Sequence, residues 1–117
     1  MDYPAFVASK KKAGHAITEA LTPEQADALH MAVGVASEAG ELLDAVKRWA
    51  IYQKPLDLPN VMEELGDLEF FMEGLRQRLG ISRESTIEGN RAKLDKRYAK
   101  GYTDAEAAAR ADKEQGQ

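Results

Sequence analysis

Apolar residues recur at intervals of three and four through the middle of the chain, which is the spacing of one side of an α-helix. The clearest run lies between Pro59 and Gly80. Its apolar positions are Val61, Leu65, Leu68, Met72, Leu75 and Leu79. Helices commonly end on a glycine, and Gly80 directly follows the last of these positions. The pattern therefore predicts an amphipathic helix that starts near Pro59 and stops at Gly80.

A longer helix is expected before this one. Thr22 is placed to cap its first turn, Pro23 occupies the first helical position, and Gln25 completes a capping box with Thr22. The helical pattern runs to about Gln53, and the two prolines of residues 54–59 end it. Because this connection is short, the two helices are expected to lie antiparallel.

The two ends of the chain carry further helical signals. Residues 4–20 are expected to form a first helix, although Gly14 weakens that pattern. A fourth helix is predicted between Ser82 and about residue 98, capped by Ser82 or by Ser85, which forms a capping box with Glu88.

A last start is indicated by Thr103 with Glu106, and the charged residues 107–117 are expected to fray. No convincing strand pattern is present. We predict an all-α fold, a four-to-five-helix antiparallel bundle completed by oligomerisation. It forms one domain over residues 1–117, with its core at about 22–102 and a short helix or frayed tail at 103–117.

Composition narrows the functional class. Of the 117 residues 44% are hydrophobic, which suits one small core, and acids outnumber bases by 20 to 16. This charge argues against a nucleic-acid polymer as the partner, because phosphate binding needs a basic face. The chain has no cysteine, so disulfides and thiolate metal sites are excluded. The sequence contains neither a long apolar run nor the pattern of a signal peptide. We therefore expect a cytoplasmic protein without a membrane partner.

Two pairs of acids lie within the segments that look most like core. Glu38 and Glu41 are roughly 60° apart on a helical wheel, and Glu64 and Asp67 have the same separation on the next helix. His30 lies on the same side of the helix as Glu38 and Glu41, and most of the other residues of this helix are apolar or small. If the two helices pack antiparallel, the four carboxylates converge.

Converged carboxylates need compensation, because two of them about 4 Å apart repel by about 4 kcal/mol at an effective dielectric constant of about 20. Protonation of one acid is one solution. A cluster of four more naturally holds divalent cations, and an all-oxygen ligand set favours Mg²⁺ or Mn²⁺ over Zn²⁺. Acid pairs at this spacing are also common on solvated helix surfaces, so wheel geometry alone leaves that alternative open.

A polar stripe follows on the predicted fourth helix. Asn90, Lys93 and Arg97 are spaced by three and four, and Tyr98 lies on the packed side. Such donors suit the oxygens of a polyphosphate whose remaining charge is neutralised by cations. An ordinary solvated helix is the alternative.

Three residues of the long helix and its end are further candidates for substrate contacts. Trp49 is placed either to stack on a base or to close the core or a dimer interface. His30 is placed to read a base edge or to serve as a polar group near the helix end. Lys47, Arg48 and Lys54 surround Trp49 in the sequence, and all three are candidates to contact phosphate.

Together these motifs resemble those of the MazG-like nucleoside triphosphate pyrophosphohydrolases, all-helical enzymes related to the helical dUTPases and to phosphoribosyl-ATP pyrophosphatase. The resemblance covers roughly residues 25–102 and rests on SEAGELLD, EELGDLEFF and NRAKLDKRY. The stretches HMAVGVASEAGELLDAVK and GYTDAEAAARADKE are similar to the small single-domain members of bacteria and phages. Ser37, Ala99, Gly89 and Arg91 depart from the family pattern, and the preferred base and sugar are not predicted.

The resemblance implies an enzyme that cleaves NTPs or dNTPs between the α- and β-phosphates, releasing a nucleoside monophosphate and pyrophosphate. Glu38, Glu41, Glu64 and Asp67 would bind Mg²⁺, for which Mn²⁺ would substitute, and Glu41 or Glu38 would act on the attacking water. It also implies that Asn90, Lys93 and Tyr98, with Arg97, contact the nucleotide, and that the protein is a homodimer or homotetramer. The alternative is a non-catalytic helical module that binds a nucleotide or a protein.

Overall fold

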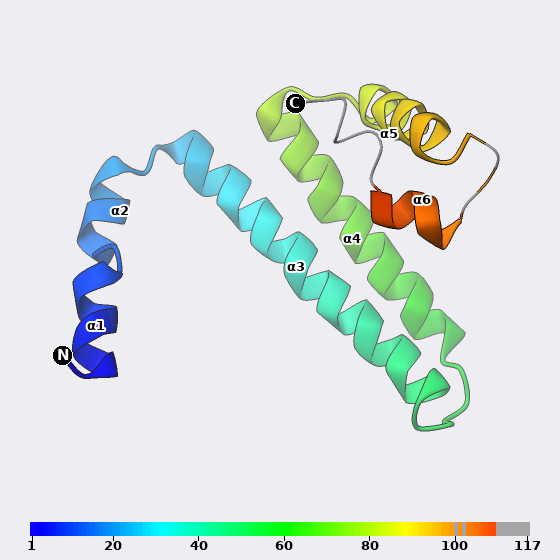
Figure 1. Ribbon diagram of the computed structural model, residues 1–117, viewed down its shortest axis with the longest axis horizontal. Helices are drawn as coiled ribbons and strands as arrows, with labels where there is room; N and C mark the ends of the chain where they lie inside the picture. Colours follow the sequence, from blue (N-terminus) through cyan, green and yellow to red (C-terminus); the bar gives the residue numbers. More distant parts are fainter. Residues whose placement is uncertain (100, 102, 110–117) are drawn as a thin grey trace. The chain divides into compact units, whose positions relative to one another are not determined.

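The structure is a computed structural model that describes residues 1–99, 101 and 103–109. Its helices are α1 (Tyr3–Lys10), α2 (Gly14–Ala20), α3 (Pro23–Ala50), α4 (Leu58–Leu79), α5 (Arg83–Arg97) and α6 (Asp104–Ala109) (Figure 1). None of the described residues forms a strand, so the all-α prediction is confirmed. The chain divides into two compact units, Met1–Arg78 and the part that begins at Leu79.

The single helix predicted over residues 4–20 is wrong, because the chain forms α1 and α2 instead. Lys11 and Ala13 between them have extended backbones, with ψ angles of 147° and 138°. A glycine inside a helix costs about 1 kcal/mol relative to alanine, and the break leaves Gly14 at the first position of α2.

Helix α3 begins as predicted. The Gln25 N–H donates to the Thr22 hydroxyl at 3.1 Å, and the Thr22 N–H donates to the Gln25 side chain at 2.9 Å, so the capping box is complete. The helix ends at Ala50, slightly before the predicted Gln53. Gln53 itself has a φ of 56°, in the left-handed region that only a few non-glycine residues adopt.

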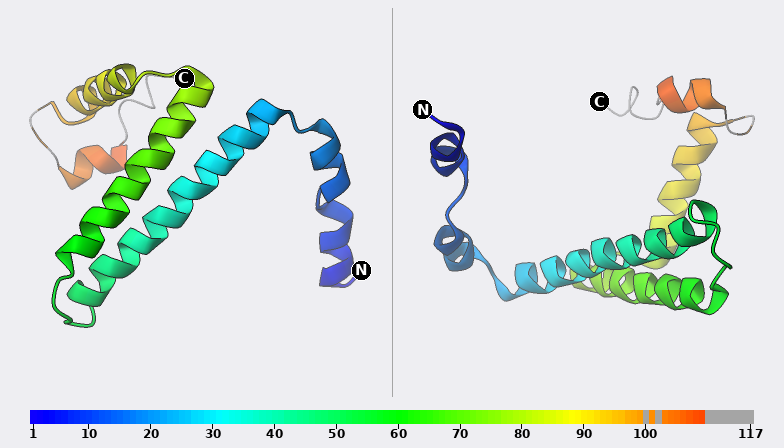
Figure 2. Two further views of the ribbon diagram at one scale, coloured as in Figure 1. Left: turned by 180° about the vertical axis from the view of Figure 1, so that it is seen from behind. Right: turned by 90° about the horizontal axis from the view of Figure 1, so that it is seen from below.

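Helix α4 runs back alongside α3, as the three views agree (Figures 1 and 2). Its first turn is capped by Asp57, whose carboxylate accepts the Asn60 N–H at 3.2 Å. Gly80, with a φ of 69°, follows its last residue, as the sequence predicts. The antiparallel pairing of these two helices is confirmed.

Two glycines, one on each helix, allow α3 and α4 to approach. An ideal Cβ at Gly34 would collide with the Phe71 ring, and one at Gly74 would collide with the Met31 thioether. Each helix therefore inserts a large side chain where the other has none. Gly40 and Gly66, the glycines of the two acid motifs, would meet nothing within 4 Å, so they do not set the distance between the helices.

The side of α3 away from this packing is apolar as well. Leu29, Val33 and Leu43 fall within about 80° of one another on the helix, opposite Glu38. They are 53%, 57% and 67% exposed, whereas Ala45, on the side facing α4, is 5% exposed. A helix that is apolar on two sides has two surfaces to bury, and in the described chain only one is covered.

The second unit contains α5 and α6. The Ser82 hydroxyl accepts the Ser85 N–H at 3.0 Å, so Ser82 is the cap of α5 and Ser85 lies within the helix. Thr103 accepts the Glu106 N–H at 3.1 Å and starts α6, which confirms that signal. The predicted fraying also concerns residues 110–117, which lie outside the described residues. None of the described helices is long and apolar enough to cross a membrane.

Candidate metal centre

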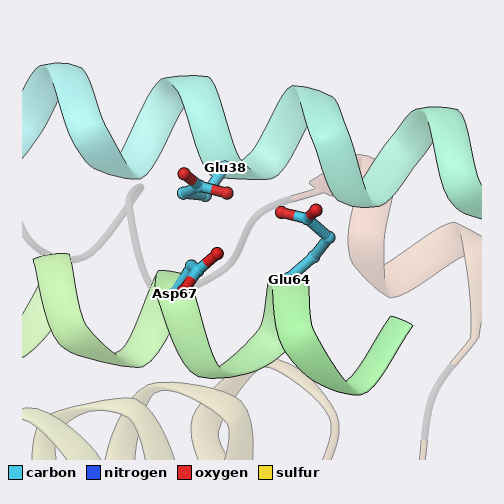
Figure 3. A group of neighbouring side chains, drawn as sticks. All are labelled: Glu38, Glu64 and Asp67. Carbon is cyan, nitrogen blue, oxygen red and sulfur yellow. The ribbon is translucent and has the colours of Figure 1, made fainter. Parts of the chain in front are cut away.

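Three carboxylates meet between α3 and α4. Glu38 comes from α3, whereas Glu64 and Asp67 come from α4, and one oxygen of each lies within 4.8 Å of the others. Figure 3 shows the three side chains in the space between the two helices, directed toward one another. All three residues are half-buried.

Local helix geometry explains why these three side chains meet. Glu38 lies between Gly34 and Ala45 on the side of α3 that faces α4, and both of those neighbours are buried. Glu64 and Asp67 are three residues apart, so they project from adjacent turns of one side of α4. Phe71, one turn further along, packs over Gly34 and holds the two helices together beside the acids.

The pKa of Glu64 reports how crowded this cluster is. It is raised from 4.5 to about 7, first because the side chain hydrogen-bonds with Glu38 and then because of burial. The charges of Glu38, Asp67 and Glu41 raise it further. A hydrogen bond between two carboxyl groups requires a proton, so in the absence of a cation a proton provides part of the compensation.

Glu41 stands apart from the other three acids. It is exposed and does not belong to the group whose oxygens converge, although its charge still contributes to the raised pKa of Glu64. The structure therefore brings together three of the four acids named from the sequence. The role of Glu41 as a fourth ligand or as a catalytic group stays a prediction.

The converging residues fit a divalent cation. Their donor set consists only of carboxylate oxygens, which Mg²⁺ and Mn²⁺ prefer. In addition, one of the two Glu64 carboxylate oxygens, Oε2, is buried and has no hydrogen-bond partner among the described residues. A buried carboxylate oxygen without a donor is costly, and coordination to an ion would satisfy it.

The other candidates of the first unit lie along α3 and at its end. His30 and Lys54 are exposed, and Trp49 is 48% exposed, so Trp49 does not close a core within the described chain. Lys54 lines a pocket of about 300 Å³ at the turn between α3 and α4. The other lining residues of this pocket are Ala45, Arg48, Pro55 and Asp57.

The remaining candidates lie on or beside α5 in the second unit. Asn90 and Lys93 are exposed, whereas Arg97 and Tyr98 are half-buried. The Arg97 guanidinium lies over the Tyr98 ring, 5.9 Å from its centroid. Asn90 and Lys93 are therefore donors exposed to solvent, whereas the Arg97 cation lies against an aromatic ring.

A second pocket, of about 370 Å³, was not foreseen from the sequence. It is lined by Asp27, Met31, Gly74, Gln77 and Arg78, near the start of α3 and the end of α4. One signal for it exists in the sequence: Asp27 lies eleven residues before Glu38 and about 20° from it on the wheel. The partners from α4 depend on the pairing of the two helices, which no local pattern reveals.

The fold and the site together describe an all-α protein with a carboxylate cluster suited to a divalent cation between two antiparallel helices. Comparison with known families matches residues 26–102 to the MazG nucleotide pyrophosphohydrolase domain, which is 77 of the 117 residues. The chain therefore belongs to the MazG nucleotide pyrophosphohydrolase family. Searches among curated proteins and among solved structures found no match.

Proposed function

We propose that the protein is a Mg²⁺-dependent pyrophosphohydrolase that converts an NTP or a dNTP into the nucleoside monophosphate and pyrophosphate. The observation that carries this proposal is the three-carboxylate cluster, with its unpartnered Glu64 oxygen, in a chain of the MazG family. Family membership supports the class of reaction, and the cluster supports a cation site of the kind that such a reaction needs.

In this proposal Glu38, Glu64 and Asp67 hold the ion through their carboxylate oxygens. Bound Mg²⁺ would neutralise phosphate charge and lower the pKa of a coordinated water, with Mn²⁺ as a substitute. Glu41 orients the attacking water toward the α-phosphorus and accepts its proton. The Glu41 carboxylate supports this role because it is exposed and lies outside the cluster. It can therefore contact a water molecule without being one of the metal ligands.

The substrate contacts are proposals of the same kind. Asn90, Lys93 and Arg97, with Tyr98, offer donors to the nucleotide or its phosphates, and the exposure of Asn90 and Lys93 is consistent with that role. His30, in the first half of α3, is proposed to contact the base, and Trp49 is proposed to contact the substrate at the end of α3, beside Arg48. The half-exposed Trp49 ring favours a role outside the core.

We include a homodimer or homotetramer in the proposal. The exposed apolar side of α3, formed by Leu29, Val33 and Leu43, supports it, because soluble monomers rarely leave such a stripe open to water. The competing function is a non-catalytic helical module that binds a nucleotide or a protein with the same helices.

The decisive experiment incubates the pure protein with each NTP and dNTP plus Mg²⁺ and separates the products. Monophosphate and pyrophosphate are expected from at least one nucleotide. Diphosphate and phosphate would place the cleavage at another bond, and no product from any of them would leave the non-catalytic module as the better explanation.

Calorimetric Mg²⁺ titration tests the cation site independently of the substrate. Wild type should bind the ion, whereas Glu38→Ala and Asp67→Ala should bind it far more weakly. Glu69→Ala is the matched control, because Glu69 is an exposed acid of α4 outside the cluster. Equal binding by all four proteins would contradict the assignment.

A further inference from the structure

The turn between α3 and α4 holds a pocket that the proposed catalytic residues do not use. It has a volume of about 300 Å³, and its lining includes two cationic side chains, Arg48 and Lys54, and one anionic side chain, Asp57. Ala45, which is 5% exposed, is one of the two lining residues that come from α3. The pocket lies wholly within the first unit of the chain.

The backbone brings the two cations to the same place. Gln53, with its φ of 56°, reverses the chain after α3, and the Lys54 N–H then donates to the Arg48 carbonyl at 3.0 Å. A left-handed conformation costs a non-glycine residue roughly 1–2 kcal/mol. The turn therefore accepts a strained residue and in doing so places Lys54 beside Arg48.

Arg48 and Lys54 differ in how far nearby acids already neutralise their charge. Nε of Arg48 lies 3.4 Å from Asp44, whereas the Lys54 ammonium has no ion pair among the described residues. Asp57 is the one acid in the lining, and its carboxylate already accepts the Asn60 N–H that it caps. The lining residues alone thus carry a net charge of +1, and Lys54 is the cation available for an anion.

The pocket lies next to the carboxylate cluster along both helices. Ala45 is seven residues after Glu38, and Asp57 is seven residues before Glu64, which is about 10 Å along each helix axis. The long, flexible side chain of Lys54 reduces the distance that a ligand has to span between the carboxylate cluster and the pocket. A phosphate chain held over the carboxylates by cations can therefore extend toward the pocket.

We infer that this pocket binds the terminal phosphates of the substrate, the pair released as pyrophosphate, through Lys54 and Arg48. This inference rests on the proposed function and adds a direction to it: the polyphosphate points toward the α3–α4 turn, and the nucleoside points toward the open end of the two helices. Lys and Arg neutralise the outer phosphate oxygens that the carboxylate side of the site repels.

The test measures binding of inorganic pyrophosphate by calorimetry, with saturating Mg²⁺, to the full chain. Lys54→Ala should weaken pyrophosphate binding about tenfold, which is the loss of one charged hydrogen bond of about 1.4 kcal/mol. Lys54→Arg should retain most of the affinity. Lys12→Ala is the matched control, because it removes the same charge from an exposed position outside the pocket.

Nucleoside monophosphate binding, measured in the same way, should be unchanged by Lys54→Ala. An equal loss for monophosphate and pyrophosphate would overturn the direction of the phosphate chain. Undiminished pyrophosphate binding by Lys54→Ala, or no binding by wild type, would overturn the pocket itself.

A parallel hydrolysis assay separates this inference from the proposed function. If wild type cleaves nucleotides but Lys54→Ala binds pyrophosphate as wild type does, the pocket assignment fails and the function stands. If wild type cleaves none of the nucleotides but its pyrophosphate binding depends on Lys54, the function fails and the anion site stands.

Discussion

The ring of Phe71 on α4 occupies the space that a side chain at Gly34 on α3 would need. This contact lies one turn from both Glu38 and Asp67, so the same approach of the helices that seats the ring brings the acids together. The distance between α3 and α4 is therefore set partly by the absence of a single Cβ atom.

Gly34→Ala should destabilise the fold, by about 1–3 kcal/mol, because a rigid ring and the backbone have to move apart. Gly40→Ala is the matched control: Gly40 lies in the same helix with nothing within 4 Å, and alanine there should raise stability by about 0.5–1 kcal/mol. Urea unfolding of the two variants measures the difference. An equal change in the free energy of unfolding of both variants would show that the packing of Phe71 does not require a glycine at position 34.

Gly74→Ala should cost less than Gly34→Ala. The side chain in the way is that of Met31, whose unbranched thioether adopts other rotamers more easily than a phenyl ring can move. The comparison uses the same urea titrations, and a larger loss for Gly74→Ala would mean that Met31 is held as rigidly as Phe71.

Glu64 should make the stability of the metal-free protein depend on pH. Its pKa is about 7 in the folded chain and 4.5 as the ordinary value, so the folded state binds this proton more tightly. The contribution is fully present below pH 4.5 and is lost as the pH rises through 7. Thermal unfolding in EDTA should show wild type losing stability relative to Glu64→Gln between pH 5 and pH 8.

Mg²⁺ should reverse this trend, because a bound ion would replace the proton. Added Mg²⁺ should therefore raise the unfolding temperature of wild type more at pH 8 than at pH 5.5. A stability difference between wild type and Glu64→Gln that does not change with pH would contradict the raised pKa.

Glu41→Gln should separate catalysis from metal binding. If Glu41 accepts a proton from water, kcat should fall by roughly 10²- to 10⁴-fold while Mg²⁺ affinity stays near that of wild type. Glu38→Gln should lose Mg²⁺ affinity as well. A loss of Mg²⁺ affinity in Glu41→Gln as large as in Glu38→Gln would identify Glu41 as a ligand instead.

Leu43→Glu should dissociate an oligomer formed through the outer side of α3. The leucine is 67% exposed, so the substitution costs little in the isolated chain but would bury a charge in an interface. Sedimentation of wild type and variant measures the change, with Glu69→Ala as the control. An unchanged oligomer, with both proteins folded by circular dichroism, would place the interface elsewhere.

Much of the local structure was predictable from the sequence because it depends on neighbours in the chain. The capping box of Thr22 and Gln25, the end of α4 before Gly80 and the start of α6 after Thr103 all use contacts within four residues. The pairing of acids at a spacing of three is equally local. The break between α1 and α2 is also local, but the sequence did not reveal it. The apolar pattern of these residues is weak, and Gly14 was the only signal that a continuous helix would be unfavourable.

The sequence by itself determined which residues are helical, which acids share a side of each helix, and to which family the chain is similar, since these follow from backbone periodicity and residue type. Only the tertiary structure decided that Gly34 and Gly74, rather than Gly40 and Gly66, lie at the close contacts. It also placed Glu41 outside the converged acids and Lys54 in a pocket beside them. These outcomes depend on how far α3 is rotated and shifted against α4, which is set by side chains far apart in the sequence.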